Sequence, residues 1–321
     1  MSGSRSVLVT GGSGYIGSQL IADLALNRGE LETIVSLDLR PVPEDRRLDG
    51  VHYRTGDIRD PEISEAFRSH AVDTVVHLAA IVTPGKDSSR EFEYSIDVLG
   101  TRNVIDHCLA TGVRKLIVTS SGAAYGYHAD NPQPLTEDDA IRGNPEFAYS
   151  DHKRQVEEML ARYRREHREL AQLVFRPGTI LGAKVANQIT AIFERPLIIG
   201  VRGAETPFVF IWDGDVVACL RRGIEEESEG IYNLAGDGVL SLAEIARRLG
   251  KPYVAPPAGA IRAVLRLLHP LGLSPYGPEQ VDFLRYRPVL SNAKLKSEFG
   301  YTPQLTTAEV FDLYWRSHES G

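Results

Sequence analysis

A tyrosine and a lysine four residues apart are the strongest candidates for chemistry in this chain. Tyr149 and Lys153 lie in a stretch that is expected to be helical, so they share one face about one turn apart. A free tyrosine has a pKa near 10, and a nearby ammonium favours the phenolate. Lys153, aided by further positive charge in a partly dry cleft, is expected to bring the pKa of Tyr149 towards 7, a change of roughly 4 kcal/mol.

A serine at the end of an apolar strand supplies the third candidate. The strand Lys115 to Thr119 runs into Ser120-Ser121, and Ser121 precedes Tyr149 by 28 residues. Ser121 would orient a substrate oxygen while Tyr149 takes the hydroxyl proton and a hydride leaves the same carbon. The Tyr-x-x-x-Lys pattern occurs once, where chance gives roughly 0.3 matches. The alternative is a solvated Tyr–Lys pair on a helix surface.

A glycine-rich turn near the N-terminus predicts a phosphate site. The apolar run Val7 to Val9 is followed by Gly11, Gly14 and Gly17, and a helix is expected from Tyr15 to Arg28. Such a turn directs backbone N–H groups and the positive end of a helix dipole at one point, which suits a pyrophosphate. Gly11 would allow the tight turn, Gly14 would leave room for the phosphate, and Gly17 would let helix and strand pack closely.

An acidic residue after the second strand favours NAD. The strand Thr33 to Leu37 ends in Asp38, 21 residues after Gly17, where a carboxylate can accept both ribose hydroxyls of NAD. The same charge would repel the 2′-phosphate of NADP, although Arg40 could serve that phosphate. The alternative is that Asp38 merely ends a strand.

Strands alternate with helices from residue 5 to about 177, which is typical of a doubly wound parallel sheet. We therefore expect an α/β, Rossmann-type domain over 1–177 and a smaller mixed α/β substrate domain over 178–321. Parts of about 207–230 are expected to return to the first domain. The expected strands are 7–9, 33–37, 51–55, 72–78, 115–119 and 173–177, and the expected helices are 15–28, 61–69, 91–110 and 147–169.

Composition excludes several classes of protein. The chain has 321 residues, a net charge of −7 and a pI of about 5.8, so a nucleic-acid or anionic-membrane surface is not expected. It has no apolar run of membrane-spanning length, and Met1 to Ser6 do not resemble a secretory signal. Cys108 and Cys219 lack metal-ligand spacing, so no metal is expected, and buried free thiols suit the cytoplasm.

Together these motifs resemble the extended short-chain dehydrogenase/reductase family, and within it the NAD-dependent epimerase/dehydratase group that includes UDP-glucose 4-epimerase. The resemblance covers nearly the whole chain and is strongest to about residue 180. It rests on Thr10-Gly11-x-x-Gly14-x-x-Gly17, His77-x-Ala79-Ala80, Thr119-Ser120-Ser121, Tyr125-Gly126, Tyr149-x-x-x-Lys153, Arg176-Pro177 and the closing Phe299-Gly300-Tyr301-x-Pro303.

The resemblance implies roles for individual residues. Catalysis would fall to Ser121, Tyr149 and Lys153. NAD would be held by Tyr149 and Lys153 together with Gly11, Gly14, Tyr15, Ile16, Gly17, Asp38, Leu39, Asp57, Ile58, Leu78, Ala79, Ala80 and Pro177. For Asp57 the alternative is a helix N-cap ahead of Pro61. The resemblance also implies a homodimer formed through the two long helices, at about 92–110 and 147–169.

Three departures concern the substrate. Asp97 stands where the family usually has asparagine, and Thr179 stands where sugar-nucleotide members carry an asparagine that helps to bind the diphosphate. Thr206-Pro207-Phe208 replaces Arg-Asp-Phe, so the arginine that would clamp the diphosphate is missing. The possible substitutes are Arg202, Arg285 and Arg287.

Three functions remain open at this stage. The first is transient oxidation of a secondary alcohol, as in a sugar-nucleotide epimerase. The second is a net alcohol dehydrogenase or ketone reductase with a non-nucleotide substrate. The third is an NAD(H) sensor without chemistry, which is disfavoured because Tyr149 and Lys153 are both present. A dehydratase is also disfavoured, because Gly122, Ala123 and Ala124 supply no further acid or base.

Overall fold

The computed structural model describes residues 4–85, 88–271, 273 and 277–319. Its centre is a seven-stranded sheet in the order β11-β6-β5-β4-β1-β2-β3, and every neighbouring pair is parallel. The predicted Rossmann-type sheet is therefore confirmed, with a seventh strand from later in the chain. The strands are β1 (Ser6–Thr10), β2 (Thr33–Asp38), β3 (Val51–Thr55), β4 (Thr74–His77), β5 (Lys115–Thr119), β6 (Ala171–Pro177) and β11 (Gly230–Leu234).

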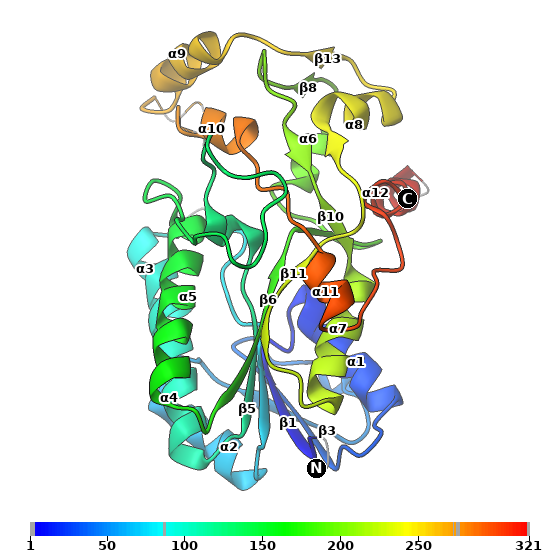
Figure 1. The fold of residues 1–321 in the computed structure, drawn as a ribbon. Helices are drawn as coiled ribbons and strands as arrows, with labels where there is room; N and C mark the ends of the chain where they lie inside the picture. Colours follow the sequence, from blue (N-terminus) through cyan, green and yellow to red (C-terminus); the bar gives the residue numbers. More distant parts are fainter. Residues whose placement is uncertain (1–3, 86–87, 272, 274–276, 320–321) are drawn as a thin grey trace.

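Helices cover both faces of this sheet (Figure 1). One face packs against α1 (Tyr15–Leu26), α7 (Asp213–Glu225) and α11 (Ala293–Ser297). The other packs against α2 (Ser64–Ser69), α4 (Thr101–Thr111) and α5 (Ala148–Glu166). Central strands that are buried on both faces explain the near-continuous apolar runs in the sequence. The free thiols of Cys108 and Cys219 are buried in these two cores, as predicted.

The chain leaves the sheet after β6 and returns to it with α7 and β11. The remaining segments form the second domain around a buried aromatic cluster of Phe193, Phe208, Phe210, Phe311 and Tyr314. Its strands are β7 (Thr179–Leu181), β8 (Ile198–Ile199), β9 (Pro207–Phe208), β10 (Phe210–Trp212), β12 (Leu240–Ser241) and β13 (Tyr253–Val254). Its helices are α6 (Thr190–Glu194), α8 (Leu242–Arg248), α9 (Ala258–Leu268), α10 (Gln280–Arg285) and α12 (Thr307–Glu319).

The predicted helix over 91–110 is not one continuous α-helix. It consists of α3 (Arg90–Tyr94), a π-helical turn η3 (Ser95–Gly100) and α4. The π turn contains Asp97, whose side chain is buried. Such turns are frequent at functional sites. Short 3₁₀ turns occupy η1 (Glu44–Arg46), η2 (Pro61–Ile63) and η4 (Gly122–Tyr125). Within the described residues, no helix has the length and apolar character needed to cross a bilayer.

Candidate active site

The glycine turn between β1 and α1 lies against the end of β4. Gly11 has a φ of 71°, and a Cβ built on it would lie 2.7 Å from the backbone nitrogen of Ala79. A Cβ on Gly17 would lie 2.1 Å from the carbonyl oxygen of Gly11. Both positions therefore require glycine, as predicted. The close approach also brings the Leu78–Ala80 segment to the glycine turn.

Gly14 leaves space at the start of α1. It is the N-cap of this helix and forms no side-chain cap, so the first N–H groups are available to a ligand. A Cβ on Gly14 would meet only the carbonyl oxygen of Gly11, at 3.0 Å. This cradle fits a pyrophosphate. The side chain of Tyr15 points elsewhere, since its hydroxyl donates to Asp213 Oδ2 at 2.6 Å, so Tyr15 would contribute to the cradle through its backbone N–H.

The carboxylate of Asp38 lies beside the same turn. Oδ2 accepts the N–H of Ser13 at 3.0 Å, and Oδ1 accepts the N–H of Arg40 at 2.9 Å. Asp38 is therefore placed where the adenosine ribose would lie if a pyrophosphate occupied the turn. Its neighbour Leu39 is 61% exposed at this edge of the sheet.

Asp57 does not cap the helix that follows it. Its carboxylate accepts the backbone N–H of Arg59 at 2.9 Å and bonds the guanidinium of the same residue with both oxygens. Hydrogen bonding by Arg59 lowers the pKa of Asp57. The N-cap alternative is therefore wrong, while contact of Asp57 and the buried Ile58 with adenine stays a prediction.

Ser121, Tyr149 and Lys153 converge where β5 ends. The Ser121 hydroxyl accepts the N–H of Ala123 at 3.1 Å and lies close enough to the phenol of Tyr149 to lower its pKa. Lys153 Nζ lies 5.7 Å from the centre of the Tyr149 ring and donates to the carbonyl oxygen of Thr119 at 3.1 Å. Ser150 ties the start of α5 to the same turn by donating to the Ala123 carbonyl at 2.7 Å. The structure thus brings together the three side chains that the sequence singled out.

Burial changes the pKa values of both Tyr149 and Lys153 in this site. Burial raises the pKa of Tyr149 to about 12, the bond from Ser121 opposes the rise, and Asp97 adds to it. Burial also lowers the pKa of Lys153, while the carboxylates of Asp97 and Glu157 raise it. The pKa of Tyr149 is therefore raised in the protein alone, mainly because the phenol loses contact with water, and its lowering with the cofactor bound stays a prediction.

His77, at the end of β4, is a structural histidine. Thr10 Oγ1 lies 2.7 Å from its Nδ1, and Thr101 Oγ1 lies 2.9 Å from its Nε2. Because Thr101 donates its own proton to the Asp97 carbonyl at 2.6 Å, His77 Nε2–H is the donor to Thr101 and Nδ1 accepts from Thr10. Burial lowers the pKa of His77 to about 3, so the ring stays neutral at pH 7.

This neutral ring predicts a loss of stability in acid. A histidine with a pKa of 6.5 when unfolded and about 3 when folded contributes fully above pH 6.5 and progressively less as the pH falls towards 3. Urea unfolding at pH 7 and pH 4 should show wild type losing about 3 kcal/mol more than His77→Gln. The exposed His52→Gln serves as the control and should keep the wild-type loss. Equal losses in wild type and His77→Gln would contradict the assignment.

A buried arginine lies on the opposite side of the site. Arg287 is 8% exposed, and its Nη2 donates to Thr179 Oγ1 at 3.2 Å. Its guanidinium lies over the rings of Phe208 and Phe283, at 4.1 and 4.9 Å from their centres. Nε and Nη1 are buried without a partner within the described residues, and burial lowers the pKa of Arg287 to about 10. A buried cation whose N–H groups are unsatisfied is suited to an anionic ligand.

Tyr127 connects this arginine with the Tyr149 end of the site. Its ring lies 4.7 Å from Phe283 and 5.7 Å from Phe147, measured between ring centres. Burial raises the pKa of Tyr127 to about 12, Arg287 opposes the rise and Tyr149 adds to it. Both groups are therefore close enough to act on one phenol, and a ligand held by Arg287 would lie near Tyr149.

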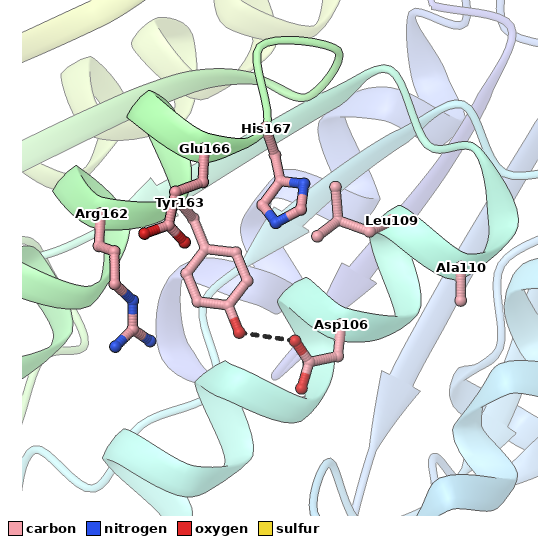
Figure 2. A pocket seen from close by; sticks show the side chains of 7 residues that line it. All are labelled: Asp106, Leu109, Ala110, Arg162, Tyr163, Glu166 and His167. Carbon is pink, nitrogen blue, oxygen red and sulfur yellow. Dashed lines mark hydrogen bonds between the residues drawn. The ribbon is translucent and has the colours of Figure 1, made fainter.

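A surface depression lies away from this site. Figure 2 shows its lining from the C-terminal ends of α4 and α5, where Tyr163 donates to Asp106 Oδ1 at 2.7 Å. Thirteen residues of helix separate Arg162, in this lining, from Tyr149, which is about 20 Å. The depression is open and bears charged side chains, so it is a feature of the outer helical face. It plays no part in the site around Tyr149.

Two parts of the site were not predicted from the sequence. The contact between Asp97 and His152 joins residues 55 apart, and Arg287 approaches Thr179 across 108 residues. Neither pair has a local spacing signal, and the sequence left Arg287 only as one of three possible substitutes for the missing arginine. Within the described residues, no group of histidine, cysteine or acidic side chains could hold a metal ion.

Comparison with known proteins agrees with this geometry. The model of the family described as "NAD dependent epimerase/dehydratase family" matches residues 7–235. D-erythronate dehydrogenase of Cupriavidus necator is 30% identical over 277 residues, which cover 78% of this chain and 83% of that protein. An uncharacterized protein of Mycobacterium tuberculosis is 26% identical over 315 residues, covering 97% and 84%. UDP-glucose 4-epimerase of Thermus thermophilus, solved with NAD, superposes with a TM-score of 0.74 at 25% identity, covering 99% and 100%.

Proposed function

Because the chain belongs to the NAD-dependent epimerase/dehydratase family, we propose that it transfers a hydride reversibly at a secondary alcohol or ketone carbon of an anionic small molecule. The observation that carries this function is the convergence of Ser121, Tyr149 and Lys153 at the end of β5. An NAD(H) sensor without chemistry would not need a phenol, a hydroxyl and an ammonium close together. The protein is proposed to act in the cytoplasm.

The residues around the glycine turn would hold NAD. Gly11, Gly14 and the N–H groups of Tyr15, Ile16 and Gly17 would face the pyrophosphate, and Asp38 would accept the ribose hydroxyls. Leu39, Asp57, Ile58, Leu78, Ala79, Ala80 and Pro177 are the further proposed contacts. When bound, NAD supplies the hydride acceptor and a positively charged ring.

Three side chains of this protein would carry out the proton transfer. Ser121 would hold the substrate oxygen against Tyr149, and Tyr149 would take the hydroxyl proton in oxidation and return it in reduction. Lys153 would hold the nicotinamide ribose and keep positive charge near the phenol. Since burial holds the Tyr149 pKa at about 12, reaching pH 7 takes roughly 7 kcal/mol, which positive charge in the closed site must supply.

The anionic end of the substrate is assigned to Arg287. Of the three substitute arginines, Arg202 is exposed and Arg285 lies over Tyr286, whereas Arg287 contacts Thr179, the position of the missing asparagine. A phosphate of a sugar nucleotide would fit this guanidinium, which favours a 4-epimerase-like reaction. A carboxylate would fit it equally well.

A net dehydrogenase is the second candidate function. Arg287 is a single guanidinium beside a threonine, where sugar-nucleotide members have an asparagine and an additional arginine, so the site is better matched to one small anion than to a diphosphate. The relative from Cupriavidus necator is a dehydrogenase for D-erythronate, a hydroxy acid. A sugar acid is therefore the proposed non-nucleotide substrate class.

One assay separates these functions. Purified protein is incubated with UDP-glucose, and separately with D-erythronate and related sugar acids plus NAD, while sugar products and NADH are both quantified. We expect either UDP-galactose without net NADH, or NADH in proportion to the alcohol oxidised. The first result identifies an epimerase and the second a dehydrogenase. Tight NAD binding without turnover on a broad panel of both substrate classes would overturn the proposal and favour a sensor.

The homodimer through α4 and α5 stays a proposal. The outer face of these helices bears Arg102, Asp106, Arg162 and Glu166, all exposed, so an interface there would be polar. Complementary pairs such as Asp106 with Arg162 of a second copy would be needed to compensate for lost hydration.

A further inference from the structure

Exposed apolar side chains gather on and just after α9, at the end of the second domain that lies away from the central sheet (Figure 1). None of the residues of α9 is buried. Val264 and Leu267 on this helix, and Leu271 and Leu273 just after it, are each more than half exposed. These four side chains are the α9 patch. Exposed apolar residues that are scattered singly are ordinary, whereas a cluster of them marks an interaction site.

The outward orientation of the patch follows from the way in which α9 is attached. Arg262 Nη2 donates to Asp282 Oδ1 of α10 at 2.6 Å. With 3.6 residues per turn, Val264 lies on the side of the helix opposite Arg262, and Leu267 lies one turn further along that side. The remaining large apolar residues of the helix are half-buried, namely Ile261, Leu265 and Leu268. α9 therefore packs on the domain with one apolar face and leaves a second one in solvent.

Two further exposed apolar side chains lie at the same end of the molecule. Ile199 of β8 and Val254 of β13 are opposite each other in a parallel pair, and both are exposed. The chain runs from this strand pair into α9, and Arg202 N–H donates to the carbonyl oxygen of Pro256 on the way, at 2.9 Å. Apolar exposure at this end is therefore not confined to one helix.

The charge around the patch has the opposite sign to that of the whole chain. Residues 245–278 contain no aspartate or glutamate, although the chain has 43 acidic residues and a net charge of −7. The cationic residues of the same stretch are Arg247, Arg248, Lys251, Arg262 and Arg266. Arg266 is exposed and is the neighbour of Leu267 in the chain. An apolar helix face flanked by cationic side chains is typical of a helix that lies on an anionic membrane surface.

Two other kinds of partner match this surface less well. A second copy of the chain would bring its own Arg266 into the same acid-free contact, so like charges would meet. A nucleic acid would bind the arginines through its phosphates and leave the leucines in water. A lipid interface compensates both, since headgroup phosphates pair with guanidinium groups and the acyl region accepts the leucines.

We propose that the α9 patch docks the protein on an anionic lipid surface, with α9 parallel to the membrane plane and Arg266 among the headgroups. The net charge of −7 argues against such a surface for the chain as a whole, so docking is restricted to this acid-free end. The patch lies outside the site around Tyr149, and its binding can be measured without substrate. The inference therefore does not rest on the proposed function.

Vesicle co-sedimentation of the full-length protein tests the proposal. Wild type should bind vesicles of phosphatidylcholine and phosphatidylglycerol roughly tenfold more tightly than vesicles of phosphatidylcholine alone, and the difference should shrink as salt rises. Leu267→Gln should weaken binding roughly tenfold, because one leucine no longer enters the interface. Arg266→Gln should weaken it and reduce its salt dependence. The matched control is Leu26→Gln, which changes a leucine that is 83% exposed at the end of α1 and should retain wild-type binding.

A fluorescent label reports on the same contact independently. Because the native Cys108 and Cys219 are buried, the cysteine of Leu267→Cys can be labelled selectively with an environment-sensitive dye. Its emission should shift to shorter wavelength on anionic vesicles, whereas the same dye on Leu26→Cys should not shift. Absence of binding to anionic vesicles, wild-type binding by Leu267→Gln, or equal shifts at both labels would overturn the proposal. A dimer that Leu267→Gln dissociates, without vesicle binding by wild type, would also overturn it and assign the patch to a second copy.

Discussion

Tyr149→Phe is expected to reduce kcat/KM by about 10²- to 10⁴-fold while NAD binding stays at the wild-type level. The substitution removes only the phenolic oxygen, so the ring still fills its place beside Lys153. What is lost is the proposed proton acceptor beside Ser121. Steady-state kinetics with the substrate identified by the product assay, together with NAD titration, measure the two quantities separately.

The matched control for this variant lies on the same helix. Tyr163→Phe also removes one phenol from α5, but its hydroxyl bonds Asp106 on the outer face, away from the sheet edge. This variant should retain wild-type kcat/KM. Wild-type turnover in Tyr149→Phe would contradict the proposed role of Tyr149 in the proton transfer.

The role of Tyr149 also predicts how the oxidation rate depends on pH. Oxidation needs the phenolate, and burial holds the Tyr149 pKa at about 12 in the protein alone, so the wild-type oxidation rate should rise with pH through the neutral range. The slope approaches tenfold per pH unit where only a small fraction of the phenol is ionised. Residual activity of Tyr149→Phe should lack this rise.

The sequence was sufficient for the part of the site that is local in the chain. Gly11, Gly14 and Gly17 lie in one turn, and Tyr149 and Lys153 lie one helical turn apart, so spacing alone predicts their proximity. Alternating strands and helices then predict that both groups reach the carboxyl edge of one parallel sheet. The capping box of Ser241 and Glu244 at the start of α8 is equally local, since its two residues lie three positions apart.

The sequence was insufficient where tertiary packing determines the conformation or the burial of a residue. A heptad-like apolar pattern from 91 to 110 predicts one helix, and it does not reveal the π turn that turns Asp97 inward. The burial that raises the pKa of Tyr149 in the protein alone was also not predicted, because charge spacing is visible in a sequence and desolvation is not. For the missing diphosphate arginine the sequence left three candidates, and the structure brings only Arg287 to Thr179.

Replacing Arg287 with methionine should separate substrate binding from stability. The variant removes a buried guanidinium whose Nε and Nη1 have no partner among the described residues, and methionine can occupy the space between Phe208 and Phe283. Replacing an uncompensated buried charge by an apolar side chain is often neutral or stabilising. We therefore expect an unchanged or higher Tm in the absence of anions.

Substrate binding by Arg287→Met should become weaker, although its Tm is unchanged or higher. Two charge-assisted hydrogen bonds to a phosphate or carboxylate are worth about 3–5 kcal/mol, so KM should rise by about 10²- to 10³-fold. Inorganic phosphate, which should raise the Tm of wild type through this site, should no longer do so in Arg287→Met. Arg285→Met is the control: this arginine lies over Tyr286, so its loss should leave KM and the phosphate effect unchanged.

The two readouts together distinguish an anion site from a structural arginine. A structural guanidinium would give a lower Tm and a KM close to that of wild type, because its contacts with Thr179 and the two phenylalanine rings would then be its whole contribution. An anion site gives the reverse pattern, since those N–H groups satisfy their hydrogen bonds only when the ligand is present. A fall in Tm without a change in KM would therefore reassign Arg287 to the core of the second domain and leave the anionic end of the substrate without a partner.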